Sequence, residues 1–88
     1  MPPESPPLSL APLLARIASE SALIKRLALS DETFRDIVDD FLLAHRTLSD
    51  LKRQPVAEHA KIREYRDLVD QLEQDIRRYL ARLNPQAT

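Results

Sequence analysis

Apolar residues recur at spacings of three and four along the last third of the chain without interruption. This is the period of one face of an α-helix, and it predicts a helix over residues 56–83. Leu68 and Leu80 widen the stripe to the breadth expected of a helix that packs on a core. Asn84-Pro85 is a stop signal after it. The stripe consists of Ile62, Tyr65, Val69, Leu72, Ile76, Tyr79 and Leu83.

A second apolar stripe with the same period predicts a helix over residues 31–53. Gln54-Pro55 ends this helix, because the residue before a proline avoids the α region. His45 lies within the stripe, whereas Leu43 projects from the opposite side as a single exposed leucine. The stripe consists of Phe34, Ile37, Val38, Phe41, Ala44, Leu48 and Leu51.

A shorter stripe near the start of the chain predicts an amphipathic helix over residues 11–28. Proline is tolerated in a first turn, so Pro12 is compatible with this helix. Ser21 falls in the middle of the stripe, which makes it weaker than the other two. The stripe consists of Leu10, Leu13, Leu14, Ile17, Ser21, Ile24 and Ala28.

The boundary between the first two helices carries several local signals. Ser30 is the predicted N-cap, because its hydroxyl can accept from the free N–H groups of a first helical turn. Asp31 and Glu32 then oppose the positive end of the helix dipole. Leu29 and Phe34 are predicted to form a hydrophobic staple across the cap.

The short connection around Pro55 predicts that the two long helices are antiparallel neighbours. Lys52 and Glu58 are expected to meet beside this turn or to extend into solvent together. The chain has no Gly, which makes β-turns and bulges costly, so an all-α fold is predicted. We expect one helical domain over residues 10–84 between a disordered Pro-rich tail, residues 1–9, and a disordered tail, residues 85–88.

A two-helix hairpin of this size is short of buried apolar area, since each ordered residue costs roughly 1.5 kcal/mol in entropy. The missing burial must come from the N-terminal helix, from a second copy or from another protein. The favoured arrangement is a homodimer in which two hairpins form a four-helix bundle with coiled-coil-like packing. Its apolar seam is predicted to comprise Phe34, Ile37, Val38, Phe41, Leu48, Ile62, Tyr65, Val69, Leu72, Ile76, Tyr79 and Leu83.

Charge and composition narrow the classes of partner. The net charge is −1, and no basic tract offers strong phosphate affinity, so nucleic acid is not an expected partner. No window of membrane-spanning length escapes charged residues, so no transmembrane segment is expected. The N-terminus lacks the basic and long apolar regions of a secretory signal. With no Cys in the chain, a cytoplasmic location is expected.

Candidate catalytic and metal-binding chemistry is sparse. His45 and His59 are the only histidines, and neither has the carboxylate spacing of a helical metal site. His45 is interpreted as a packing residue at the core edge. A chain without Gly also lacks a glycine-rich phosphate loop. We therefore expect no enzyme, no metal, no cofactor and no small-molecule ligand.

The outer face of the helix predicted over 31–53 is acidic, with Asp36, Asp39 and Asp40 close together. Asp36 and Asp40 are four residues apart and repel each other slightly. A solvated helix face explains such a cluster, and the functional alternatives are binding of a divalent cation or of a basic partner.

These observations favour a non-enzymatic protein–protein interaction module, such as a small adaptor, assembly or regulatory protein. It would bind itself, an unidentified protein, or both. One alternative is membrane-surface association through the N-terminal amphipathic helix, which Arg16, Lys25 and Arg26 flank. Another is a small helical DNA-binding regulator, although no helix presents a basic face for reading bases.

Overall fold

The computed structural model describes residues 9–83, and every regular element in that range is helical. The all-α prediction is therefore confirmed. Most of the predicted tails and the stop signal at Asn84-Pro85 lie outside the described residues. The elements are α1 (Ala11–Arg16), the 3-10 turn η1 (Ala18–Glu20), α2 (Ser21–Ser30), α3 (Glu32–Arg53) and α4 (His59–Leu83).

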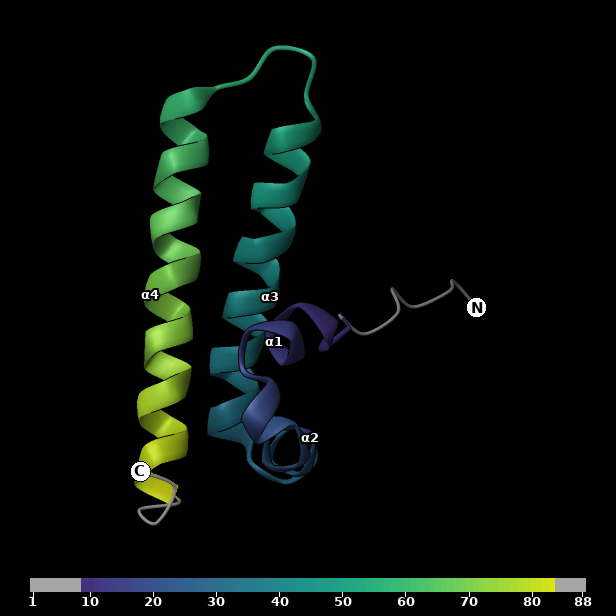
Figure 1. Cartoon of the computed structure of the whole chain (residues 1–88), viewed down its shortest axis with the longest axis vertical. Coiled ribbons are helices and arrows are strands. Elements are labelled where there is room, and N and C mark those ends of the chain that lie inside the picture. Colours follow the sequence, from purple (N-terminus) through teal and green to yellow (C-terminus); the bar gives the residue numbers. More distant parts are fainter. Residues whose placement is uncertain (1–8, 84–88) are drawn as a thin grey trace.

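The two long helices, α3 and α4, form the predicted antiparallel hairpin (Figure 1). Gln54 adopts an extended conformation at φ −67° and ψ 141°, as a residue before proline should. α4 begins at residue 59, three residues later than predicted. The expected Lys52–Glu58 contact is replaced by an ion pair of 3.4 Å between Glu58 and Lys61. Lys61 lies one turn along the same chain segment, so this pairing needs no closure across the loop.

The continuous helix predicted over residues 11–28 is corrected to three segments. Ile17 interrupts it with φ −127° and ψ 57°, and its side chain is buried. Ser19 and Ser21 follow the break, and serine is a weaker helix former than alanine or leucine. The carbonyl of Arg16, at the end of α1, accepts a hydrogen bond of 3.0 Å from Arg77 Nη2. A contact with α4 therefore satisfies a group that the break exposes.

The N-cap of α3 is Asp31 rather than the predicted Ser30. Asp31 Oδ1 accepts from the backbone N–H of Phe34 at 3.1 Å, while Ser30 Oγ donates to the carbonyl of Arg26. The one-residue shift turns Leu29 outward, leaving it 82% exposed, so the predicted Leu29–Phe34 staple does not form. Phe34 instead packs on Tyr79 of α4, with ring centroids 5.5 Å apart.

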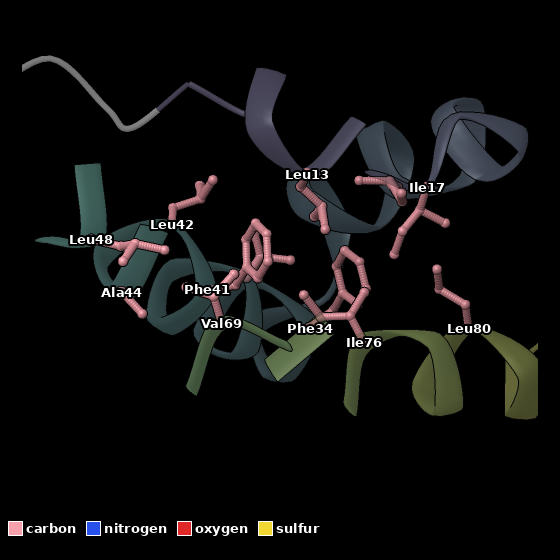
Figure 2. Close-up of a cluster of buried hydrophobic side chains, with 12 residues drawn as sticks. Leu13, Ile17, Phe34, Phe41, Leu42, Ala44, Leu48, Val69, Ile76 and Leu80 are labelled. Atoms are coloured by element: carbon pink, nitrogen blue, oxygen red, sulfur yellow. The ribbon is translucent and has the colours of Figure 1, made fainter. Parts of the chain in front are cut away.

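A single cluster of apolar side chains forms the core, and all four α-helices contribute to it (Figure 2). Phe34 and Phe41 of α3 are its largest fully buried members. No charged or polar residue is buried within the described range. The cluster consists of Leu13, Ile17, Ile24, Phe34, Val38, Phe41, Leu42, Ala44, Leu48, Val69, Ile76 and Leu80.

An ion-pair network joins α1 to α4 over this core. Arg16 Nη1 lies 2.7 Å from Glu73 Oε1 and 3.4 Å from Asp70 Oδ1. Arg77 Nε donates to the other Glu73 oxygen at 3.0 Å. The Arg16 guanidinium also lies 5.9 Å from the centre of the Phe41 ring, within cation–π range. The hydrogen bond from Arg16 is the main reason that the pKa of Glu73 is lowered.

The core position of Ile76 yields a stability prediction. Ile76→Val should lower the free energy of unfolding by about 0.5–1.5 kcal/mol, because it leaves a methylene-sized void in a closed site. Ile76 is fully buried, whereas Val56 in the turn is exposed. The change in free energy is measured as the shift of the urea midpoint, provided that the variant and the unmodified chain have the same m-value. Val56→Ala is the surface control. Equal midpoints for the two variants would contradict this placement of the core.

The lowered pKa of Glu73 predicts a pH dependence of stability. A carboxyl with a depressed folded-state pKa stabilises the fold above its unfolded pKa of about 4.3. That stabilisation is lost as the pH falls through the folded-state value. The pKa of Asp31 is lowered as well, chiefly by the hydrogen bond from Tyr79. Ionised Asp31 therefore also stabilises the fold, and this stabilisation is lost at low pH.

Glu73→Gln should therefore lose on the order of 1 kcal/mol at pH 7, given that Arg16 remains partly exposed. It should also show a shallower fall in its urea midpoint between pH 6 and pH 3 than the unmodified chain. Glu64→Gln, at an exposed glutamate of the same helix, is the control. A Glu73→Gln curve parallel to that of the control would overturn the assignment.

Candidate protein-interaction surface

Some residues of the predicted apolar seam are buried in the core, and the others lie at least partly at the surface. Six of its members are buried: Phe34, Val38, Phe41, Leu48, Val69 and Ile76. Five others are half-buried: Ile37, Ile62, Tyr65, Leu72 and Tyr79. Leu83, at the end of α4, is exposed. The chain thus closes part of the seam internally and leaves the rest partly open to solvent.

Of the open members, Ile62 and Tyr65 lie toward the turn of the hairpin and Leu72 lies near the middle of α4, whereas the others lie toward the opposite end. Figure 1 shows α1 and α2 beside the half of α3 that is remote from the turn. Nearer the turn, in residues 46–53 and 59–69, no third helix of the described range accompanies α3 and α4. Within this turn half, α4 contributes only Val69 to the buried residues, and Ile62 and Tyr65 remain half-buried. The turn half is therefore a two-helix layer with partly exposed apolar side chains.

A shallow groove of about 380 Å³ runs between α3 and α4 in this region. We call it the hairpin groove. Ala44 is its buried floor, and Leu68 and Leu43, which are 42% and 59% exposed, stand at its edges. Its lining consists of Asp40, Leu43, Ala44, Thr47, Tyr65, Leu68 and Leu72.

A second groove, of about 610 Å³, lies between the end of α2 and the first half of α3. We call it the α2–α3 groove. Val38 and Leu42 are its buried members, and the strongly exposed Leu29 forms a wall. Leu42 here and Thr47 in the hairpin groove are five residues apart, so they point about 140° apart around α3. The two grooves therefore open on different sides of α3, sharing Leu43 and Asp40.

The predicted acidic face adjoins both grooves. Asp36, Asp39 and Asp40 are exposed on α3. Asp39 and Asp40 line the α2–α3 groove, and Asp40 also reaches the hairpin groove. Ion pairs within residues 9–83 use other carboxylates, those of Glu58, Asp70, Glu73 and Asp75. The acidic face is thus a set of solvated charges beside apolar surface.

Sequence reasoning missed the leucines that accompany these charges. It treated Leu43 as an ordinary exposed leucine and placed Leu29 in a staple. Leu43 follows Asp39 and Asp40 at spacings of four and three, so a shared helix face was visible in the sequence. The exposure of Leu29 was not, because it depends on which residue caps α3.

The histidine at the core edge packs as interpreted. His45 is half-buried and stacks on Phe41, with ring centroids 6.1 Å apart. Burial lowers the pKa of His45, and the positive charges of Arg16 and Lys52 lower it further. Residues 9–83 contain no group of three or more His, Cys, Asp or Glu side chains that could hold a metal ion.

The face on which the membrane-surface alternative depends is largely occupied. Leu13, Ile17 and Ile24 from the N-terminal segment are buried in the core, and Arg16 is engaged by Asp70 and Glu73. Within the described part of the chain, no helix has the length and apolarity needed to span a bilayer.

No protein-family model, curated protein or solved structure matches the chain. The function must therefore be inferred from the geometry and chemistry of the two grooves.

Proposed function

We propose that this chain is a non-enzymatic protein–protein interaction module that acts in the cytoplasm as a homodimer. Two hairpins pack through their hairpin grooves into a four-helix bundle, and the dimer serves as a small adaptor, assembly or regulatory protein. The observation that carries the proposal is the hairpin groove itself. It is an apolar depression across α3 and α4, in the half of the hairpin that α1 and α2 leave uncovered.

The shape of the groove suits a helical partner. Ala44 provides a small, buried floor into which a larger side chain can insert, while Leu68 and Tyr65 flank it from α4. Helices of four-helix bundles pack in this way, with side chains of one helix entering the spaces between those of its neighbours. Burying the half-exposed residues of the turn half would extend the core along the full length of α3 and α4.

A second copy of the chain is the favoured occupant of the hairpin groove, because the same surface then forms both sides of the interface. Two-fold symmetry places one apolar groove against an identical one, and such self-complementary contacts are the commonest in soluble oligomers. This arrangement also supplies the burial that a two-helix layer lacks. A cytoplasmic location fits a chain that has no cysteine and hence no disulfide to form.

The proposal predicts the solution mass. Multi-angle light scattering across a hundred-fold concentration range should give about twice the chain mass of 10.1 kDa. Leu68→Asp should give the monomer mass with unchanged helical circular dichroism, because it places a charge in the groove. Leu68 suits the test since it is already partly exposed, whereas Leu72 packs against the core.

Val56→Asp, at an exposed apolar residue of the turn outside both grooves, is the matched control and should remain dimeric. A wild-type mass of one chain at every concentration would overturn the homodimer. A Leu68→Asp variant that stays as dimeric as the control would overturn the assignment of the groove.

A further inference from the structure

We propose that the α2–α3 groove is the docking site for an amphipathic helix of a partner protein, one whose apolar stripe is flanked by Lys and Arg. The proposal names the chemistry of the partner that the interaction module binds, and in that sense it rests on the proposed function. Its surface overlaps that of the homodimer only at Leu43 and Asp40, whereas Leu29, Ala28 and Leu10 line this groove alone.

The groove has the apolar character that helix docking requires. Its buried members, Val38 and Leu42, belong to the core, and the exposed Leu29 and Leu43 also line it. A single exposed leucine is ordinary, but here two strongly exposed leucines from different helices border one depression. A helix that presents apolar side chains at i, i+3 or i+4, and i+7 fills such a groove and covers both walls.

The wall formed by α2 is held in place by hydrogen bonds. Arg35 Nε donates to the carbonyl of Ala28 at 2.8 Å, and the backbone N–H of Asp31 donates to the carbonyl of Leu27 at 2.8 Å. Ser30 Oγ donates to the carbonyl of Arg26 at 2.9 Å. These bonds fix the last turn of α2, so Leu29 is presented to a partner without further ordering, which favours binding.

The charge around the groove selects a basic partner. Asp39 and Asp40 line it, and Asp36 lies on the same face of α3. The one cationic side chain in the lining, Arg35, is engaged with the end of α2. Lys and Arg beside the apolar stripe of an incoming helix would meet these carboxylates, and such complementarity speeds association and excludes acidic competitors.

The same charges argue against the start of the chain as the occupant. Residues 1–8 directly precede Ser9 and Leu10 in the sequence, and Leu10 is part of the groove lining. Their only charged side chain is that of Glu4. A segment without Lys or Arg lacks side chains that could pair with Asp39 and Asp40 beside the groove.

The test uses the full chain and two synthetic 18-residue amphipathic peptides with the same leucine stripe. One peptide carries Lys on its polar face and the other carries Glu. Fluorescence anisotropy at 50 mM and 150 mM salt should show at least tenfold tighter binding of the Lys peptide. Leu29→Ser should weaken that binding at least tenfold, whereas Leu83→Ser, at an exposed leucine outside both grooves, should leave it within twofold.

A charge-matched pair of double variants tests whether the carboxylates of the α2–α3 groove select the basic peptide. Asp39→Asn with Asp40→Asn should reduce the preference for the Lys peptide at least fivefold. Asp50→Asn with Asp67→Asn makes the same change in net charge outside the α2–α3 groove and should leave the preference within twofold. Equal losses in the two double variants would mean that only net charge attracts the peptide, which overturns the site.

Three further results would also overturn the proposal. They are equal affinity for the Lys and Glu peptides, a Leu29→Ser variant that binds like the unmodified chain, and at least tenfold tighter binding after residues 1–8 are removed. The last would identify those residues as the occupant. Light scattering of the Leu29→Ser variant distinguishes a loss of peptide docking from a loss of the proposed homodimer. A dimeric variant that no longer binds peptide supports both proposals, and a monomeric one assigns the groove to a second copy.

Discussion

Asp31 holds three helices together at one point. Its backbone N–H bonds to the carbonyl of Leu27 at the end of α2, at 2.8 Å. One carboxylate oxygen caps α3 through the N–H of Phe34, and the other accepts a hydrogen bond of 2.6 Å from the hydroxyl of Tyr79 on α4. A capping interaction is usually local to one helix. Here the capping residue also bonds to α2 and α4. It therefore fixes the angle between α2 and α3 and the position of α4 along these two helices.

The position of this junction decides how burial is distributed along the hairpin. Because α2 is fixed at the start of α3, α1 folds back beside the adjoining half, where Arg16 meets Glu73 and the Phe41 ring. The short N-terminal segment can cover only that half. The turn half keeps its hairpin groove, and the outward turn of α2 opens the α2–α3 groove. Both candidate surfaces therefore follow from where the N-terminal segment is attached.

The hairpin was predictable because its signals are local and repeated. The spacing of apolar residues over α3 and α4 and the proline at 55 specify two helices and a turn without reference to distant contacts. The break at Ile17 and the cap at Asp31 were not predictable, since each is completed by a residue of α4, Arg77 in one case and Tyr79 in the other. Ser30 and Asp31 are equally good caps in isolation. The candidate surface followed the same rule: the acidic residues lie in one helix and were found, whereas the groove beside them needs α2 and α3 together.

The contacts of Arg16 have a consequence for the order in which the chain can assemble. Its partners Glu73 and Arg77 lie 57 and 61 residues further along the sequence. During synthesis α1 emerges before α4, yet the Arg16 side chain and carbonyl that anchor α1 lack these partners until most of α4 has been made. Contacts of such long sequence separation form late and slow the folding of a small helical protein. Among the helices of residues 9–83, α4 is thus made after α1, α2 and α3, yet it is the one that locks α1 in place.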